Sequence, residues 1–280
     1  MLLLKSALQE TLEGWQEDIN PQWRIITDSV KLGFEDVSAD LMIEPWEPIF
    51  PSRKGRSFPG EPEGAHIFRA FDGICPEDVR CVLLGQDPYP CPAFSTGRAF
   101  EAGNTKNWCE LDKMFSKSVR AFLLQIAATR FNRSELASDF KKWPQLLNEI
   151  ETGKVDFGTP SSIADRWVKS GVLLLNSSLT LSRFRVNVDP HQSHGHFLLW
   201  RPLMIAVLQY LASTNHSITI ITLGNSAESI TKQANLREKN GIQVIKRPHP
   251  AFFNEFLACE NPFMICNIHM QKSGVSPIDW

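Results

Sequence analysis

An apolar run that ends abruptly in a rigid polar loop is the feature that most restricts how this sequence can fold. Residues 81–90 read CVLLGQDPYP, so a buried-strand pattern stops at Gly85 and two prolines follow. A short apolar run bounded by Gly and Pro predicts a strand, and the prolines fix φ and leave Asp87 little freedom. Open α/β sheets bind ligands beyond the carboxyl ends of their strands. We therefore expect Gln86, Asp87 and Tyr89 to lie in a preorganised active-site loop, although an Asp-Pro pair also begins many ordinary surface turns.

The rest of the chain alternates short apolar runs with longer segments of helical periodicity. Strands are predicted at Val82–Leu84, Val172–Leu175, Ser217–Leu223 and Ile242–Ile245, and helices near residues 65–71, 113–129, 161–170, 196–212, 225–235 and 261–272. Residues 1–36 predict one or two further helices. Strands and helices that alternate in this way form a parallel sheet covered on both faces. The predicted fold class is α/β, with three α/β/α layers around a central parallel four-stranded sheet and a helical N-terminal extension over residues 1–40.

Three more polar or aromatic residues stand at or near the ends of apolar segments. Phe100 lies in the segment GRAF, Asn176 ends the run GVLLLN, and His249 lies in RPHP. With Asp87 they supply a carboxylate, an aromatic ring, an amide and an imidazole. Asn often caps a helix or turn, and Phe is often a core residue, so Asn176 and Phe100 also have ordinary structural interpretations. In a parallel sheet the loops that carry active groups would gather at one edge.

The order of these motifs resembles that of the uracil-excising family of uracil-DNA glycosylases. The family pattern GQDPYH, G-x-AF, LLLN and HPSP has counterparts here in GQDPYP, GRAF, LLLN and RPHPAF, in that order. Further similar segments are SLTLS after Asn176, the pair Ser193-His194 followed by Trp200, and the closing residues 277–280. The resemblance covers roughly residues 40–280. It implies a monofunctional DNA glycosylase that flips a pyrimidine, with uracil as the expected base, out of DNA and hydrolyses its N-glycosidic bond.

The resemblance also implies which residues carry out the reaction. Cleavage of a glycosidic bond builds positive charge on the sugar and negative charge on the leaving base. Asp87 would serve the sugar cation and orient or activate the attacking water. His249 would donate a hydrogen bond to the pyrimidine O2 as that oxygen becomes anionic. No lysine lies in these motifs to form a Schiff base, so we expect no strand cleavage by the same enzyme.

Four residues are expected to hold the base. Asn176 would present a donor and an acceptor to the Watson–Crick edge of the flipped pyrimidine and so distinguish uracil from cytosine. Phe100 would stack on the base. By resemblance, Tyr89 closes the C5 side of the ring and rejects the methyl group of thymine, and Gln86 adds further contacts to the base.

Two further sets of residues are expected to contact the DNA outside the flipped base. An apolar side chain that fills the vacated stack offsets the cost of flipping. Phe253 occupies the family position for this wedge, and the adjacent Phe252 is the alternative. Contacts to the DNA backbone are expected from Arg183, Arg185, Lys246 and Arg247.

Several departures from the family pattern leave the substrate open. The sixth residue of GQDPYH is Pro90 here, HPSPLS becomes HPAFFN, and residues 103–160 contain an expected insertion. A second hypothesis is therefore a glycosylase of a modified pyrimidine, such as the hydroxymethylated or glucosylated cytosine of phage DNA, that acts in anti-phage defence. Tyr89 argues against it. A third hypothesis is a non-catalytic module that binds DNA or another partner on the same scaffold.

Composition favours one domain over residues 1–280. The chain is 42% hydrophobic, with 18 Phe and 8 Trp, which is enough for a large core. Its net charge of −2 is no signature of a nucleic-acid binder, so DNA binding would need a local basic rim. The six cysteines include no C-x-x-C pair, and we expect neither a metal nor a cofactor. With no leader and no apolar stretch near about 18 residues, the sequence predicts a cytoplasmic monomer that does not associate with membranes.

Overall fold

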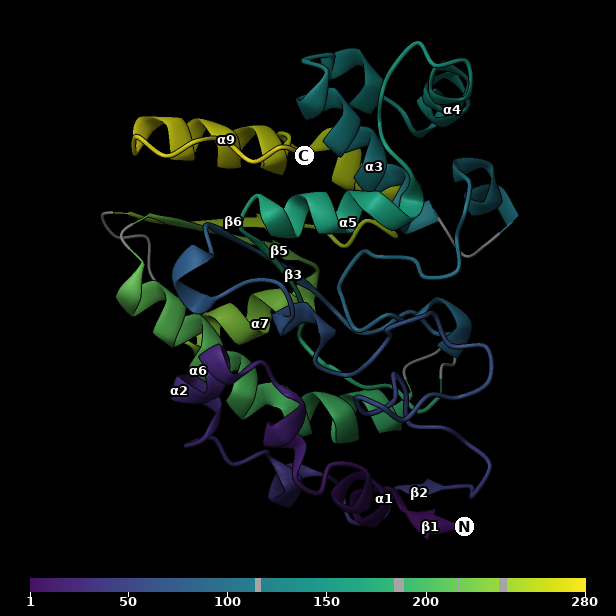
Figure 1. The fold of residues 1–280 in the computed structure, drawn as a ribbon, viewed down its shortest axis with the longest axis vertical. Coiled ribbons are helices and arrows are strands. Elements are labelled where there is room, and N and C mark those ends of the chain that lie inside the picture. The colour runs from purple at the N-terminus through teal and green to yellow at the C-terminus, as the bar shows by residue number, and fades with distance from the viewer. Residues whose placement is uncertain (114–116, 184–188, 216, 237–240) are drawn as a thin grey trace.

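A four-stranded parallel sheet forms the centre of the computed structural model (Figure 1). The structure describes residues 1–113, 117–183, 189–215, 217–236 and 241–280. The strands are β3 (Cys81–Gly85), β4 (Val172–Asn176), β5 (Ile218–Leu223) and β6 (Ile242–Arg247), in the spatial order β4-β3-β5-β6. The prediction of a central parallel four-stranded sheet is confirmed, and the ends of the predicted strands lie within two residues of the observed ends.

The register of the sheet brings the predicted site loops to one edge. Gly85 of β3 is opposite Asn176 of β4, and Leu223 of β5 is opposite Arg247 of β6. Because the four strands are parallel, the residues that follow these positions leave the sheet at the same edge. The loop that carries Asp87 therefore begins beside Asn176.

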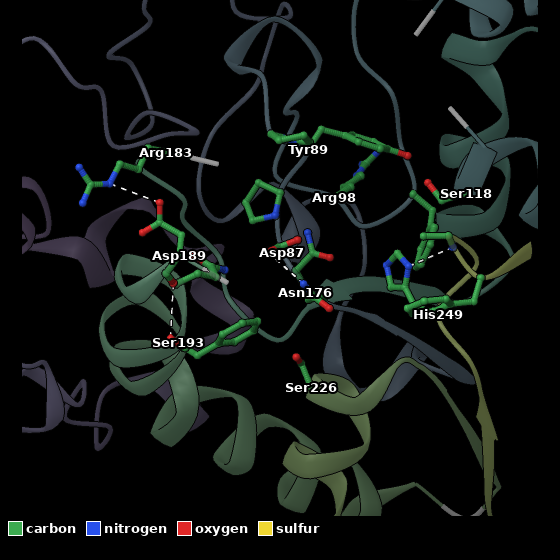
Figure 2. Close-up of a pocket in the computed structure, with 18 residues that line it drawn as sticks. Asp87, Tyr89, Arg98, Ser118, Asn176, Arg183, Asp189, Ser193, Ser226 and His249 are labelled. Atoms are coloured by element: carbon green, nitrogen blue, oxygen red, sulfur yellow. Dashed lines mark hydrogen bonds and ion pairs between the residues drawn. The ribbon is translucent and has the colours of Figure 1, made fainter. Parts of the chain in front are cut away.

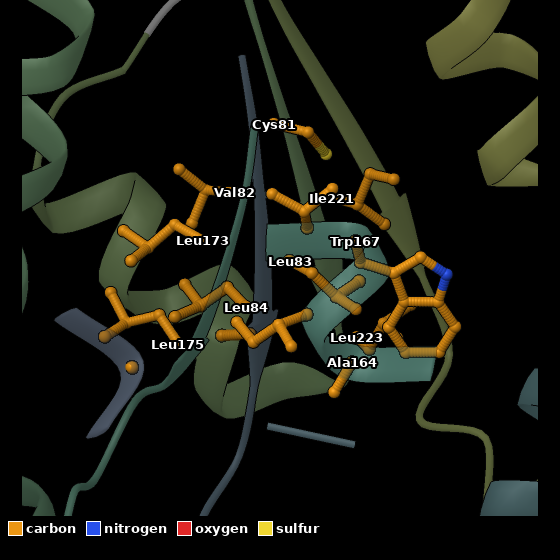
Figure 3. Close-up of a cluster of buried hydrophobic side chains, with 14 of the residues drawn as sticks. Cys81, Val82, Leu83, Leu84, Ala164, Trp167, Leu173, Leu175, Ile221 and Leu223 are labelled. Carbon is orange, nitrogen blue, oxygen red and sulfur yellow. The ribbon is translucent and has the colours of Figure 1, made fainter. Parts of the chain in front are cut away.

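The strands are apolar on both faces because helices cover both faces of the sheet. β3 and β4 are buried along their whole length, which explains why the sequence shows continuous apolar runs instead of alternation. Figure 3 shows Leu83 directed toward Ala164 and Trp167, whereas Val82 points to the opposite face. The sheet is thus the middle layer of the core.

Helices form the two outer layers, and the three-layer prediction is confirmed (Figure 1). One face is covered by α3 (Lys117–Arg130), α5 (Pro160–Lys169) and α9 (Pro262–Lys272), and the other by α6 (Phe197–Thr214) and α7 (Asn225–Gln233). Two shorter helices that the sequence analysis does not predict, α4 (Trp143–Glu151) and α8 (Phe253–Ala258), pack with α3. Much of the expected insertion at residues 103–160 therefore belongs to a layer that covers the sheet.

The N-terminal half contains less helix than the sequence predicts. The extension forms α1 (Leu4–Thr11) and α2 (Arg24–Thr27), with 3-10 turns between them, and β1 (Leu2–Leu3) pairs with β2 (Met42–Ile43). The predicted helix near 65–71 is reduced to a 3-10 turn at Arg69–Phe71. The backbone before this turn bonds across the fold instead of along a helix, since the His66 N–H donates to Thr96 O at 3.2 Å.

Side chains of the extension enter the same core as the sheet. Leu4 and Trp23 are completely buried. The indole Nε1–H of Trp23 donates to the carbonyl of Ile74 at 2.9 Å, and Asp18 pairs with the largely buried guanidinium of Arg53. Removal of the extension would therefore expose apolar surface and take away the carboxylate that pairs with Arg53.

The segment Gln192–Thr214, which contains α6, is long and apolar enough to cross a membrane by length and composition alone, with a mean hydropathy of 1.3. The sequence analysis expected no such stretch and was wrong on this point. Leu199, Trp200 and Leu203 of this segment are nevertheless completely buried, and α6 lies between the sheet and α2 (Figure 1). The apolar character of α6 follows from packing on more than one side.

Candidate active site

A cavity of about 780 Å³ opens at the carboxyl edge of the sheet (Figure 2). Ligand sites typically measure roughly 300–1,000 Å³, so this cavity is larger than one pyrimidine ring needs. The six residues predicted to bind or cleave the nucleotide all line it: Gln86, Asp87, Tyr89, Phe100, Asn176 and His249. The fold thus brings together side chains from four separate segments of the chain.

Asp87 lies two residues beyond the end of β3 and is half-buried. The side-chain Nε2 of Gln86 donates to its Oδ2 at 3.4 Å. Burial raises the pKa of the Asp87 carboxyl to about 6, against the smaller opposing effect of the nearby Gln86 and Gln192 amides. At neutral pH the carboxyl is therefore mostly ionised but is a stronger base than an exposed carboxylate, which suits a group that accepts a proton from water.

Asn176 is held at the sheet edge by close packing against β3. It is 4% exposed. A Cβ atom at Gly85 would lie 2.6 Å from Asn176 Oδ1 and 3.2 Å from Phe100 Cε2, so the site requires glycine there. Within the described part of the chain, no hydrogen bond involves the Asn176 amide, so its alternative role as a cap is not observed. The amide is free to bind a ligand in the cavity.

Phe100 is a rigid aromatic plate in the cavity wall. Its ring stacks on Phe122 with centroids 4.6 Å apart and planes 7° from parallel. Its backbone has a φ of 61°, a left-handed conformation that costs energy for a bulky residue and is often found at functional sites. Phe100 is half-buried and lines the cavity, so the core supports the ring while the ring stays available to a base.

His249 lies just beyond the end of β6 with a defined tautomer. Its Nδ1 accepts a hydrogen bond from the backbone N–H of Ala251 at 3.1 Å (Figure 2). Burial lowers the pKa of the imidazole, so the ring is neutral at physiological pH. Because Nδ1 is an acceptor, the one proton of the neutral ring is on Nε2. The residue therefore presents an N–H donor.

Tyr89 and Arg98 contribute a phenol and a buried cation to the wall. Burial, with the negative charge of Glu101 as a smaller cause, raises the pKa of the Tyr89 hydroxyl, which stays protonated. Arg98 also lines the cavity and is 8% exposed. Its Nη1 lies 2.6 Å from Asp165 Oδ1, and its Nε has no hydrogen-bond partner among the described residues. In the segment GRAF, the motif indicated a role for Phe100 but gave no signal for Arg98.

The two adjacent phenylalanines expected to form the wedge have different surroundings. Phe252 is 63% exposed and lines the cavity. Phe253 begins α8 and packs on Phe140, with ring centroids 4.5 Å apart, and the ammonium of Lys117 lies 5.7 Å from its ring centroid. Packing therefore holds the ring of Phe253, whereas the ring of Phe252 projects from the surface.

The basic residues expected to contact DNA are paired with nearby acceptors. Arg183 lines the cavity and lies 3.4 Å from Asp189 and 3.5 Å from Glu47. Lys246 pairs with Glu228 at 3.3 Å. Arg247 donates from Nε to the carbonyl of Glu260 at 2.9 Å, and Arg185 lies outside the described residues. Contact with phosphate would have to compete with these partners.

Residues from the start of α6 and the segment before it form a wall that the sequence analysis did not identify as part of the site. We call this surface the helix wall; it consists of Asp189, Gln192, Ser193 and Phe197. We call the surface formed by Asp87, Asn176 and His249 the strand wall. Figure 2 shows Asp189 and Ser193 across the cavity from His249. The pair Ser193-His194 was the one sequence signal of the helix wall. It belongs to the ordered set of family-like segments, but no function was expected of it.

Among the described residues, no group of three or more His, Cys, Asp or Glu side chains is arranged to hold a metal ion. The six cysteines are all free thiols. The acid–base and hydrogen-bonding groups that line the cavity include the Asp87 carboxyl, the His249 imidazole and the Asn176 amide.

Comparisons with known proteins agree on one family. Residues 71–264 match the model of the uracil DNA glycosylase superfamily. The uracil-DNA glycosylase of Exiguobacterium sibiricum is 27% identical over 256 residues, which cover 88% of this chain and 94% of that protein. The uracil-DNA glycosylase of Porphyromonas gingivalis is 28% identical over 239 residues, or 82% of this chain and 87% of that protein.

Solved structures show the same fold. The UNG crystal structure from Nitratifractor salsuginis matches with a TM-score of 0.60 at 21% identity and covers 92% of this chain and 93% of that one. The crystal structure of mimivirus uracil-DNA glycosylase matches with a TM-score of 0.59 at 17% identity and covers 96% and 92% of the two chains. Sequence and fold thus lead to the same group of proteins.

Proposed function

Because the chain belongs to the uracil DNA glycosylase superfamily, we propose that it removes uracil from DNA by hydrolysis of the N-glycosidic bond and leaves an abasic site. The observation that carries this proposal is the strand wall, where a basic carboxylate, a free amide and an imidazole N–H donor face one cavity. These groups correspond to the charges that develop when the bond between sugar and base breaks.

Asp87 and His249 divide the chemistry between the sugar and the base. As the bond between C1′ and N1 breaks, its electron pair moves into the pyrimidine and negative charge builds on O2. The Nε2–H of His249 stabilises that charge as a hydrogen-bond donor. Asp87 faces the sugar cation and accepts a proton from the attacking water. A neutral imidazole is sufficient for this role, and burial keeps it neutral.

Asn176 and Phe100 provide the contacts for a flipped uracil. The amide can donate to O4 and accept from N3–H, whereas cytosine presents an amine and a bare ring nitrogen at these positions. The ring of Phe100, supported from behind by Phe122, supplies a stacking surface. Tyr89 closes the C5 side, and the exposed ring of Phe252 fills the space that the base leaves in the duplex.

The size of the cavity favours a second candidate, a glycosylase of a pyrimidine with a bulky group at C5. A volume of about 780 Å³ leaves room beyond a bare uracil. Arg98 adds a buried donor without a hydrogen-bond partner at its Nε, and such a donor suits the hydroxyl groups of a substituted base. Hydroxymethylated or glucosylated cytosine of phage DNA fits this chemistry and would make the protein a defence enzyme.

Base release distinguishes these candidates. Purified wild-type and Asp87→Asn protein would be incubated with matched oligonucleotides that contain uracil, thymine or 5-substituted cytosines, and with phage DNA that contains glucosylated hydroxymethylcytosine. Abasic sites would be detected as alkali-sensitive breaks. Cleavage at uracil that depends on Asp87 supports the first candidate, and cleavage of modified DNA alone supports the second. Silence on all substrates would leave a non-catalytic module that binds DNA or another partner.

The proposal includes the state of the protein in the cell. We propose that it acts as a cytoplasmic monomer and a single domain, and that it needs neither a metal nor a cofactor. Size-exclusion chromatography with light scattering and metal analysis of the purified protein test these points.

A further inference from the structure

A buried amide in the helix wall has no partner. Gln192 is 8% exposed and lines the cavity. Neither its Oε1 nor its Nε2 forms a hydrogen bond within the described residues. A buried polar group in a folded protein is nearly always paired with protein or with ordered water. Because the Gln192 amide has no partner among the described residues, we expect it to bind water or a ligand in the cavity.

The position of Gln192 relative to Asp87 indicates what it binds. The amide is near enough to lower the pKa of the Asp87 carboxyl as a hydrogen-bonding group, yet it makes no direct hydrogen bond of 3.5 Å or less. Two nearby polar groups that are not hydrogen-bonded to each other are commonly bridged by water. Within the Asp87 loop, Gln86 donates to Asp87 Oδ2 at 3.4 Å, whereas Pro88 and Pro90 have no N–H or side-chain donor.

The local structure explains why Gln192 faces the cavity. It begins a π-helical turn, Gln192–His196, just before α6, and such turns insert a residue into a helix and are frequent at functional sites. Gly195 in this turn packs against the N-terminal extension: a Cβ there would lie 2.9 Å from Leu4 Cδ2. Close packing behind the turn thus fixes the direction of the side chain in front of it.

We propose that Gln192 is a positioning residue that holds the attacking water against Asp87 in the glycosylase reaction. The inference deepens the proposed function and depends on it for the reaction, but the water site itself can be tested without a substrate. Gln192 Oε1 accepts one hydrogen of the water and Asp87 accepts the other. The lone pair of the water oxygen is then directed at C1′.

The step balances within the groups named. The oxygen of water forms a bond to C1′ while the bond between C1′ and N1 breaks, and the electron pair of the broken bond leaves with the base. The proton from water passes to Asp87, which returns it to the base anion or to solvent. Gln192 gains and loses no proton, since an amide is neither acid nor base in this range.

The kinetic test compares Gln192→Met with wild type under single-turnover conditions, on the base that the wild type releases. Met fills nearly the same space but lacks the amide. We expect the rate of the chemical step to fall about 10- to 100-fold, with KM unchanged. In added methanol, the fraction of methyl glycoside among the products should rise, because water loses its fixed position. An unchanged rate, or a change in KM alone, would overturn the proposal.

Gln125→Met is the matched control. Gln125 is also a buried glutamine, 1% exposed, with Oε1 unpartnered among the described residues, but it lies in α3 and does not line the cavity. The control is expected to change thermal stability and to leave both the rate and the methanol partition as in the wild type. Equal effects of the two substitutions would show that loss of a buried amide, and not of the water, is responsible.

A crystal structure of the substrate-free protein tests the water site directly. An ordered water within hydrogen-bond distance of both Gln192 and Asp87 is expected, and its loss in Gln192→Met. A wild-type site with no such water would overturn the inference even if the enzyme is active. If the wild type releases no base from any DNA, the proposed function fails, while the crystal structure still decides whether this water site exists.

Discussion

The strand wall and the helix wall face the same cavity, but the chain builds them by different means. Asp87, Asn176 and His249 follow or end strands of the parallel sheet, so the register of the sheet sets their positions. The helix wall depends instead on a π-helical turn packed against the N-terminal extension. Chemistry attached to strand ends can be found in the local sequence, whereas a side chain placed by packing between distant segments cannot.

The largest expected effect is on the strand wall. Asp87→Asn should lower the rate of base release about 10³-fold, because the amide can neither take a proton from water nor stabilise a cation as a carboxylate does. The rate would be measured in single turnovers. The exposed Asp28→Asn is a control for loss of one negative charge and should retain full activity. Activity of Asp87→Asn close to that of the wild type would remove the strand wall from the chemistry.

Loss of the imidazole donor should have the next largest effect. His249→Leu is expected to slow the chemical step about 10²-fold, since one preorganised donor to a developing anion contributes on this scale. Binding of abasic DNA should be little changed. His269→Leu, in α9, is the control, because that imidazole bonds to Thr219 and is not in the cavity wall. A large loss of DNA affinity with normal chemistry would contradict the assignment.

The two phenylalanines that follow His249 test how finely packing determines the role of a residue. Phe252→Ala should reduce activity on duplex DNA about 10-fold and have less effect on single strands, where no stacked base has to be replaced. Phe253→Ala should instead reduce thermal stability, because it removes the contact with Phe140. The assignment fails if Phe253→Ala is the variant that selectively impairs cleavage of duplex DNA.

The smallest expected effect is a dependence of stability on pH. Burial raises the pKa of Asp87 to about 6 from its usual value of 3.8. The folded protein therefore binds this proton more tightly than the unfolded chain, and the stabilisation is complete below pH 3.8 and is lost as the pH rises through about 6. Asp87→Asn should accordingly raise the melting temperature relative to wild type at pH 7, with the difference shrinking toward pH 4. A lower melting temperature of the variant at pH 7 would contradict a destabilising buried carboxylate.

Much of the fold could be predicted because continuous apolar runs report burial on both faces. The runs that contain Leu83 and Leu174 predict β3 and β4, and the glycine at position 85 marks the point where β3 gives way to the polar loop. The helix α8, with six residues, has too few turns to show a clear period, and α4 was overlooked although it is as long as α7. The segment near 65–71 has helical periodicity, but its backbone bonds to Ser52 and Thr96 replace a helix.

The site residues also divide into those that the local sequence predicts and those that it does not. Asp87, Asn176 and His249 stand in motifs whose order is informative, and the structure places them in one cavity. The motif favours Phe253 over the adjacent Phe252 as the wedge, but contact with Phe140 from another segment holds the ring of Phe253. Arg98 and Gln192 have no local signal, because the burial that makes them informative comes from other parts of the chain. Tertiary packing places Arg98 and Gln192 in the cavity wall, and neither a motif nor the hydrophobic periodicity predicts that packing.

The central claim is that Asp87 is the group that activates water in this cavity. The most direct test is the pH dependence of kcat/KM for base release from a uracil oligonucleotide by wild-type and Asp87→Asn protein. The account predicts that wild-type activity falls as the pH drops below about 6, when Asp87 becomes protonated, and that this loss is absent from the residual activity of Asp87→Asn. The same acid limb in both proteins, or none in the wild type, would contradict it.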